Sequence, residues 1–212
     1  MNLLALHTAY QDTLVVLSVN GQQFSASIHE PREQTRQLLP KVDGLLKQAN
    51  LSLTSLDALA MSHGPGSFVG LRLAASFCQS IAYALKLPIA TFSTLQLLAQ
   101  AAYRTYGAEE VAVCLNAYMG ELYVGHYRQK AGIMQPVQAD CLLKPQDLLL
   151  PDCLCVGNGL DTLDEKTHNA LPITILADDL LSLAQQAPRV SASDLKLSYL
   201  RGRSAWQTSF KE

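Results

Sequence analysis

The stretch from Ala58 to Lys86 constrains the fold of this chain more than any other part of the sequence. A short apolar strand, Ala58 to Ser62, leads into the turn Gly64-Pro65-Gly66, and Ser67 then suits the N-cap of a helix that runs to about Lys86. Polar residues on this helix form one narrow stripe, and apolar residues lie on both sides of it. A helix that is apolar over most of its circumference is buried on two sides. We therefore expect one side to cover a sheet and the other to pack against a second helix, from this chain or from a partner.

Both apolar sides of this helix consist mainly of small and branched aliphatic residues, and one side also carries an aromatic ring. One side consists of Leu71, Ala75, Cys78, Ala82 and Leu85, the other of Leu73, Ala74, Phe77, Ile81 and Ala84, and the polar stripe of Arg72, Ser76, Gln79, Tyr83 and Lys86.

The segments before this helix predict a three-stranded antiparallel start followed by a first helix. Strands are expected at Met1 to His7, Asp12 to Val19 and Gln22 to His29, because Asn20-Gly21 is a strong hairpin signal. Apolar residues at helical spacing then predict a helix from Arg32 to Asn50, and Pro40 within it should kink the helix or mark its true start.

The second half of the chain has a weaker pattern. After a strand at Pro88 to Thr91 and a helix that Ser93 caps, ending near Tyr106, two strands are expected at Glu110 to Asn116 and Glu121 to Arg128. Further on, only a strand at Cys153 to Val156 and short helices near Asp161 and Asp178 can be predicted. We expect two lobes, residues 1–106 and 107–212, with a boundary near Gly107 and a terminal segment that returns to the first lobe.

The glycine turn does not match the known phosphate-binding loops. The P-loop pattern is missing, and the run from Gly64 to Gly70 is one residue too long for the dinucleotide fingerprint. That fingerprint also needs an acid about 20 residues further on, and the stretch from Leu71 to Ala108 contains no Asp or Glu. The N-terminus of the helix could still attract an anion. Gly64, Gly66 and Ser67 therefore remain candidate anion or nucleotide contacts.

No catalytic or metal site is predicted. A nucleophile elbow around Ser67 would need glycines where Pro65 and Val69 stand, and His63 with Ser67 lacks an orienting third group. The five histidines are isolated from one another, and the five cysteines have irregular spacing, which favours buried, reduced thiols over a zinc site or disulfides.

Charge and hydropathy argue against direct nucleic-acid or membrane binding. The 16 Lys and Arg residues are scattered and the formal net charge is −2, whereas a protein that grips nucleic acid alone usually has a basic patch. The N-terminus lacks a secretory signal, and no apolar run approaches the roughly 20 residues of a membrane span. We expect a cytoplasmic protein.

Several segments together resemble the bacterial TsaB (YeaZ) family. The resemblance covers the first 128 residues nearly end to end and then becomes patchy; the most specific segment is GPGSFVGLRLA. The others are LLALHTA with its hairpin, PREQTRQLLPKVDGLLKQANLSLTSLDALA, PIATFSTLQLLAQ, LNAYMGELYVGHY and SYLRGRSAW. The resemblance implies an α/β protein with the actin/Hsp70/sugar-kinase-like (ASKHA) fold, which has two lobes, the second reduced.

The resemblance also implies a function. The family takes part in making N6-threonylcarbamoyladenosine, next to the anticodon in tRNAs that read ANN codons. Its members act as a non-catalytic subunit that binds and activates a paralogous transferase, TsaD, together with an ATPase, TsaE. The expected partners are thus a TsaD-like paralogue in a heterodimer, a TsaE-like ATPase, a second copy in a homodimer when the chain is alone, and tRNA only through the complex. No membrane and no tightly bound cofactor are expected, with ATP at most at a partner interface.

In this family the two N-terminal helices form the interface. On this sequence the resemblance assigns partner binding to residues of Arg32 to Asn50 and Ser67 to Lys86, namely Leu38, Leu39, Val42, Leu45, Leu46, Arg72, Leu73, Ala74, Phe77 and Ile81.

Two positions depart from the family pattern. In this fold the first hairpin usually carries an Asp near the phosphates and metal, as in ALDTS, where this chain has His7 in ALHTA. An imidazole cannot replace a carboxylate as a Mg²⁺ ligand, so a residual ATP site is disfavoured. Gln34 stands where relatives often have His after the Glu, at a position expected near the partner.

Two alternatives remain open from the sequence. The chain could be an enzyme of the same fold, either a weak ATPase or a peptidase, or it could be a self-sufficient regulatory homodimer.

Overall fold

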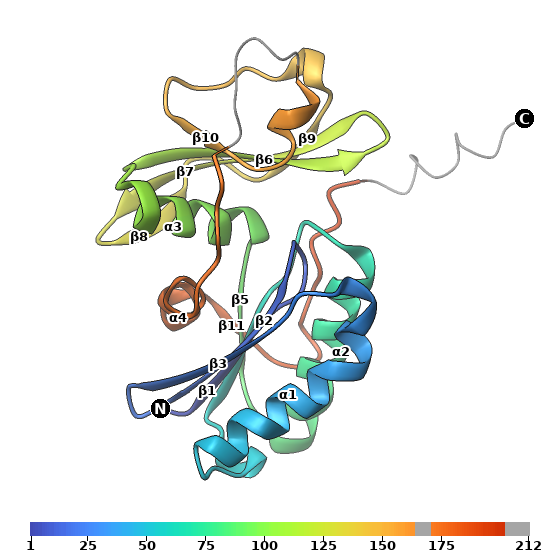
Figure 1. Ribbon diagram of the computed structural model, residues 1–212, viewed down its shortest axis with the longest axis vertical. Helices are drawn as coiled ribbons and strands as arrows, with labels where there is room; N and C mark the ends of the chain where they lie inside the picture. Colours follow the sequence, from blue (N-terminus) through green and yellow to red (C-terminus); the bar gives the residue numbers. More distant parts are fainter. Residues whose placement is uncertain (164–170, 202–212) are drawn as a thin grey trace, which may run out of the picture.

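A computed structural model describes residues 1–163 and 171–201, which form two β-sheets with four α-helices packed on them (Figure 1). His168 and the end of the SYLRGRSAW segment lie outside the described residues. The first sheet has the strand order β11-β5-β4-β1-β2-β3, in which β1, β4 and β5 run parallel to one another. Its strands are β1 (Leu3–His7), β2 (Thr13–Val19), β3 (Gln22–Ile28), β4 (Ala58–Ser62), β5 (Ile89–Phe92) and β11 (Arg189–Val190).

The first three strands form the predicted antiparallel meander. The β2–β3 turn places Asn20 at φ 50° and Gly21 at φ 89°, the left-handed conformations that this hairpin turn requires. Strand β1 lies in the middle of the sheet, between β2 and β4, and all five of its residues are buried. The prediction of a buried strand followed by a hairpin is confirmed.

Two helices cover one face of the first sheet and a third covers the other (Figure 1). Helices α1 (Gln34–Gln48) and α2 (Phe68–Leu85) pack on the first face, and α4 (Ala177–Gln186) packs on the opposite face against β1, β2 and β5. The apolar layers on both faces are continuous with the strands. One apolar side of α2 covers the sheet, as expected, and its residues Leu71, Cys78 and Ala82 are buried.

Pro40 lies inside α1 and does not mark its start. The helix begins at Gln34, after a 3-10 turn at Pro31–Glu33. Proline in a helix interior removes one backbone hydrogen bond, to the carbonyl four residues earlier. Here both Pro40 and that residue, Arg36, are exposed, so water can satisfy the freed carbonyl.

The second sheet has the order β10-β6-β7-β8, with β9 paired to β7. Helix α3 (Thr94–Tyr106) packs on this sheet, so the predicted boundary near Gly107 separates a helix from the sheet that it covers. The strands are β6 (Glu110–Tyr118), β7 (Glu121–Lys130), β8 (Ile133–Pro136), β9 (Cys141–Leu143) and β10 (Leu154–Val156), and 3-10 turns lie at Leu53–Ser55, Pro145–Asp147 and Leu160–Thr162.

Two polar clusters hold the sheets together. Arg104 of α3 donates through Nε to Asp179 of α4 at 2.8 Å and through Nη2 to the Thr174 carbonyl at 2.8 Å. At the other end of α3, Asp140 accepts hydrogen bonds from Ser93 and from Tyr127 of β7. These clusters join the α3 layer to the α4 layer and to the end of β5.

Helix α2 meets a length and composition test for a membrane span. By length and composition alone its 18 residues, with mean hydropathy 1.3, are apolar enough to cross a membrane, although no run was expected to approach that length. A single such helix is weak evidence for a span, since the core helix of a folded domain passes the same test. In this window 33% is buried inside the chain, and the exposed remainder contains both polar residues, such as Arg72 and Ser76, and apolar ones, such as Phe68 and Val69.

Candidate functional site

The glycine turn before α2 lets two backbone segments approach closely. The β1–β2 turn passes directly over the first turn of α2, so a Cβ atom on Gly70 would lie 1.9 Å from the Thr8 carbonyl oxygen. A Cβ on Gly66, whose φ is 153°, would lie 2.4 Å from the Ala9 carbonyl oxygen. Real Cβ atoms do not tolerate such distances, because they lie far inside van der Waals contact. Glycine at position 70 therefore permits the close approach of the two backbone segments.

Ser67 caps α2 as predicted. Its hydroxyl accepts from the Gly70 amide at 3.2 Å, and its own amide donates to the Ala9 carbonyl at 2.8 Å. Thr8 completes the contact by donating to the Gly70 carbonyl at 2.7 Å. The first turn of α2 is thereby fixed to the end of β1.

The three candidate anion contacts do not lie together. Gly66 and Ser67 line a cleft of about 750 Å³ between the two lobes. Gly64 instead is buried, and the space where its side chain would be is taken by the Ser198 carbonyl and Leu71. An anion contact at Gly66 and Ser67 stays a prediction, and Gly64 has a packing role.

His7 is a neutral, structural residue at the end of β1. Its ring is buried, with Nε2 3.1 Å from the Tyr10 carbonyl and Nδ1 2.8 Å from the Ser62 hydroxyl. A carbonyl only accepts, so Nε2 carries the proton and Nδ1 accepts from Ser62. Burial lowers the pKa of His7 to about 4, which keeps the ring uncharged at neutral pH.

The hydrogen-bonded pair of Ser62 and His7 resembles a nucleophile and its base, but no substrate can reach it. Ser62 has no exposed surface and His7 is 1% exposed. Nucleophilic catalysis needs a reactive oxygen that a substrate can approach. The pair therefore ties β1 to β4 rather than performing chemistry.

His63 and Ser67 do not form a catalytic pair among the described residues. The Nδ1 atom of His63 is buried without a hydrogen-bond partner, and burial lowers its pKa. The carboxylate of Asp140 raises the His63 pKa slightly, but Asp140 accepts hydrogen bonds from Ser93 and Tyr127, and burial raises its own pKa. The aspartate thus orients a helix cap and a tyrosine, not a base.

No group of three or more His, Cys, Asp or Glu within residues 1–163 and 171–201 has the geometry to hold a metal ion. The five cysteines are free thiols. Burial raises the pKa of Cys78 and that of Cys114 to about 12, so both stay protonated and unreactive at neutral pH.

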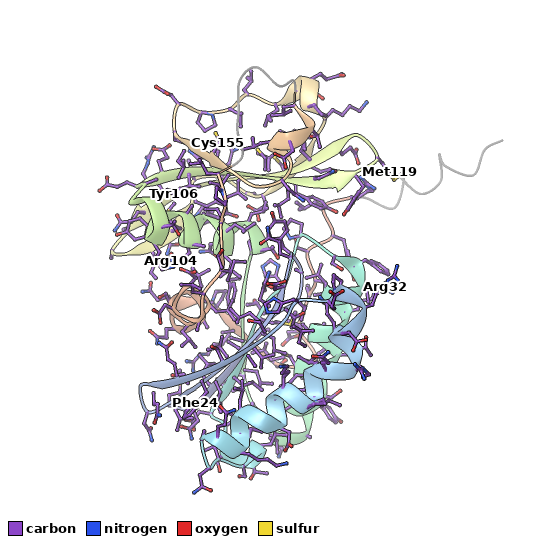
Figure 2. All side chains as sticks on the ribbon, in the orientation of Figure 1. Phe24, Arg32, Arg104, Tyr106, Met119 and Cys155 are labelled. Atoms are coloured by element: carbon purple, nitrogen blue, oxygen red, sulfur yellow. The ribbon has the colours of Figure 1, made fainter. Side chains whose placement is uncertain are left out.

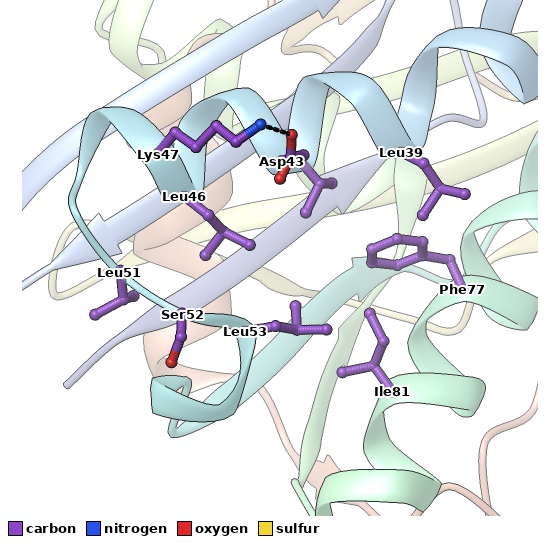
Figure 3. Close-up of a pocket in the computed structure, with 10 residues that line it drawn as sticks. Leu39, Asp43, Leu46, Lys47, Leu51, Ser52, Leu53, Phe77 and Ile81 are labelled. Atoms are coloured by element: carbon purple, nitrogen blue, oxygen red, sulfur yellow. Dashed lines mark ion pairs between the residues drawn. The ribbon is translucent and has the colours of Figure 1, made fainter.

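An apolar groove of about 300 Å³ lies between α1 and α2 on the outer surface (Figure 3). Phe77 and Ile81 of α2 face Leu39 of α1 across it, and Leu53 lines it from the loop after α1. Its one ion pair joins Lys47 Nζ to Asp43 at 2.6 Å on the α1 side. Leu39 is 64% exposed, so the groove carries aliphatic surface that no part of the described chain covers.

The ten predicted partner-binding residues divide into two sets. Leu38, Val42, Leu45 and Ala74 are at most 3% exposed and pack inside the chain, and Leu46 and Phe77 reach the surface only at the groove. The accessible ones are Leu39 and Arg72, which are exposed, and Leu73 and Ile81, which are half-buried. Sequence periodicity could not separate these sets, because a core position and a partner-facing position both carry aliphatic residues.

Residues that sequence reasoning missed include Leu51 and Leu53, which line the groove from the loop after α1. They lie outside any helical pattern, so no periodicity marks them. The only available signal was their aliphatic character in a short loop, which is unusual for a surface segment.

Residues 29–201 match the family model described as "TsaD: tRNA N6-adenosine threonylcarbamoyltransferase". The chain is 32% identical to the tRNA threonylcarbamoyladenosine biosynthesis protein TsaB of Escherichia coli, covering 98% of this chain and 97% of that one. It is 29% identical to the protein of the same name from Haemophilus influenzae, covering 98% and 96% of the two chains.

Solved structures show the same relationship. YeaZ from Pseudomonas aeruginosa superposes with a TM-score of 0.84 at 35% identity, covering 94% of this chain and 99% of that one. A second structure from the same organism, described as similar to peptidase YeaZ, superposes with a TM-score of 0.84 at 34% identity over the same shares. The two-sheet α/β architecture is therefore shared along nearly the whole length.

Proposed function

The chain belongs to the TsaB (YeaZ) family of tRNA threonylcarbamoyladenosine biosynthesis proteins, and we propose that it serves that synthesis as a non-catalytic subunit which binds and activates a TsaD-like transferase. A role in the synthesis of N6-threonylcarbamoyladenosine follows from the family. We propose three further points: that the chain is the non-catalytic subunit, that its partner is a TsaD-like transferase, and which surface binds that partner.

The observation that carries the proposal is the uncovered apolar groove between α1 and α2. Leu39 is 64% exposed, Leu73 and Ile81 are half-exposed, and the α2 window is only one-third buried. Removing apolar surface from water contributes roughly 25 cal/mol per Å². A partner that fills this groove would therefore stabilise the complex relative to the separate chains. An exposed apolar groove rimmed by charge is typical of a protein interface.

The similarity to the TsaD family model suggests how a partner would fit. A paralogue of the same fold presents two equivalent helices, so the two pairs can pack face to face about a pseudo-twofold axis. Small exposed residues on α2, Ser76, Ser80 and Ala84, allow a partner helix to approach closely. The same geometry admits a second copy, so the proposal includes a homodimer when the chain is alone.

The described residues do not provide the groups that catalysis would need, which supports the proposal of a non-catalytic subunit. The Ser62–His7 pair is sealed, His63 lacks an acidic partner in contact, and no metal cluster occurs in the described ranges. We accordingly assign threonylcarbamoyl transfer to the partner, and a TsaE-like ATPase joins the complex. In this proposal ATP binds at most at a partner interface, and the chain reaches tRNA only through the complex. The proposed complex is cytoplasmic, and the proposed fold of the chain is the ASKHA fold with a reduced second lobe.

The test is a reconstitution from tRNA, threonine, bicarbonate, ATP and the other pathway proteins, with the modified nucleoside quantified by mass spectrometry. We expect omission of this chain to abolish the product. Leu39→Glu should weaken pairing with the transferase at least tenfold and lower the product accordingly, because an unpaired carboxylate would be buried in the groove. The isolated variant should stay folded, since exposed substitutions usually change stability by less than about 0.5 kcal/mol.

Leu149→Glu is the matched control, because Leu149 is 93% exposed on the other lobe. It should pair and support modification like the unaltered chain. If Leu39→Glu pairs normally, the groove is not the interface; if product forms without the chain, the subunit role is wrong. Light scattering with and without the transferase distinguishes a heterodimer from a self-sufficient homodimer.

A further inference from the structure

Strand β3 is the longest edge strand of the two described sheets. It has seven residues, Gln22–Ile28, and lies at the end of the first sheet, paired with β2 alone. The other edge strands are shorter: β8 has four residues, β9 and β10 have three each, and β11 has two. Figure 2 shows Phe24 of β3 at the opposite end of the molecule from Cys155 of the second sheet. An edge strand presents a row of unpaired backbone N–H and C=O groups that can pair with another chain.

The sequence of β3 lacks the features that usually protect such an edge. QQFSASI contains no charged residue and no proline, and its pairing with β2 continues over all seven residues without a bulge. By contrast, β8 ends in Pro136 and β11 begins with Arg189. Natural proteins protect exposed edges with charges, prolines, bulges or short strands, so an open edge of this length is a surface suited to strand pairing.

The geometry of the β2–β3 hairpin decides which backbone groups of β3 point outward. Val19 and Gln22 close its two-residue turn, and such a closing pair exchanges both of its backbone hydrogen bonds. Every second residue from Gln22 therefore bonds to β2, whereas the N–H and C=O groups of Gln23, Ser25 and Ser27 point away from the sheet. In the described part of the chain, no backbone hydrogen bond reaches these outward groups.

Contacts on both faces of β3 hold the strand in place. Phe24 and Ala26 pack against the apolar cluster beneath α1 on one face. On the other face, the side chain of Gln23 donates to Asp178 in the first turn of α4 at 2.8 Å. A strand that is already ordered loses little conformational freedom when a second strand binds, so the edge is preorganised for pairing.

The residues of β3 are complementary to themselves in one antiparallel register. When Ser25 lies opposite the same residue of a second copy, all seven residues are paired, and the outward groups of Gln23 meet those of Ser27. On the apolar face Phe24 then lies opposite Ala26, a large side chain against a small one, and no like charges meet. Any other antiparallel register leaves residues of the strand unpaired.

We propose that β3 is a self-association surface, to which a second copy of this chain adds its own β3 in antiparallel orientation about a twofold axis at Ser25. The interface is isologous, because each copy donates and accepts the same hydrogen bonds. A single strand pair buries less surface than a typical stable dimer, so the association is weak and reversible. No residue of β3 lines the groove between α1 and α2, so a second copy on this edge and a partner in the groove can be bound at the same time.

The first test locates the twofold axis with single cysteines in the purified full chain, which also carries Leu39→Glu so that the groove does not contribute. Facing residues of a hydrogen-bonded pair have Cα atoms about 5.5 Å apart, a separation that suits a disulfide. With diamide as the oxidant, two Ser25→Cys chains should therefore form a disulfide-linked dimer. Gln23→Cys is the matched control, because Gln23 is exposed on the same face of β3 but lies on the order of 14 Å from its own copy. It should give at least about tenfold less dimer.

The second test examines the register with charges and measures self-association by sedimentation equilibrium. Gln23→Lys with Ser27→Glu places opposite charges across each pair, whereas Gln23→Lys with Ser27→Lys places like charges there. The first variant should self-associate roughly tenfold more tightly than the second. Both variants lose the hydrogen bond between Gln23 and Asp178, so that loss cancels in the comparison.

The inference is overturned if Ser25→Cys gives no more dimer than Gln23→Cys, or if the two charge variants associate equally. A chain that stays monomeric at millimolar concentration would also contradict it, because the edge would then not bind a second copy. Failure here is separable from failure of the proposed function. Loss of strand pairing leaves pairing with the transferase through Leu39 intact, whereas loss of pairing at the groove leaves the Ser25→Cys cross-link intact.

Discussion

Acid should destabilise this protein through its buried histidines, and His7 carries the larger shift in pKa. His7 is buried beneath the β1–β2 turn, and its pKa is about 4 against 6.5 for an unhindered imidazole. The unfolded chain takes up a proton at this residue as the pH falls through 6.5, while the folded chain does not until about pH 4. Folding stability is therefore complete above pH 6.5 and falls as the pH decreases through the window between the two values.

The magnitude follows from the difference between the two pKa values. A shift of about 2.5 units corresponds to a limit of about 3 kcal/mol below pH 4, and to about 2 kcal/mol at pH 5 relative to pH 8. That is a large share of the 5–15 kcal/mol that stabilises most domains. The cause is burial, which disfavours the charged ring, while the Tyr10 carbonyl favours it to a smaller extent.

The assay is urea unfolding at pH 8, 6.5 and 5, for the unaltered chain and for His7→Gln. The amide of glutamine does not titrate, so the variant should lose about 2 kcal/mol less than the unaltered chain between pH 8 and pH 5. His63, whose pKa burial also lowers, contributes equally to both proteins and cancels in the comparison. If the two stability curves run parallel across this range, His7 does not have a lowered pKa and the reasoning is wrong.

Two further substitutions test the packing of the fold by thermal unfolding. Gly70→Ala should destabilise the fold by about 3 kcal/mol or more, because its Cβ would lie 1.9 Å from the Thr8 carbonyl oxygen. Gly44→Ala is the control: its Cβ has open space within α1, so it should stabilise the fold by up to about 1 kcal/mol. Equal effects of the two substitutions would contradict the close approach at Gly70. Arg104→Ala should cost about 3–5 kcal/mol, because it leaves the carboxylate of Asp179, 2% exposed, without its ion-pair partner; a melting temperature unchanged from the parent would refute the role of that pair.

The first half of the fold was predictable because turn and helix-capping residues mark the ends of its elements. The Asn20-Gly21 hairpin, the Ser67 cap and the Ser93 cap all occur where the sequence placed them. Strands β8, β9 and β11 were not predicted, because each has at most four residues and is specified by its pairing with a distant strand. Propensity over so few residues carries little information.

The partner-binding surface stays a prediction, and the sequence could indicate its two helices but not which of their side chains are exposed. Leu38 and Leu39 are adjacent leucines, yet one is 1% and the other 64% exposed. The difference in their exposure depends on where β3 and α2 lie around α1, and tertiary packing sets that arrangement. The cleft was harder still, since Gln34, Phe68 and Tyr118 are far apart in sequence and belong to three elements.

The return of the chain to the first sheet has a consequence for synthesis on the ribosome. Helix α4 and strand β11 come from residues 177–190, yet they cover and extend a sheet whose other strands are complete by Phe92. The face of β1 and β2 that carries Leu3 and Val16 must therefore wait, uncovered, while the whole second lobe is translated. At about 5–20 residues per second this interval lasts several seconds, during which the nascent chain exposes an apolar sheet face. Chaperone binding to stalled nascent chains should accordingly end when α4 emerges, and a chain shortened before Ala177 should aggregate even though both of its interface helices are present.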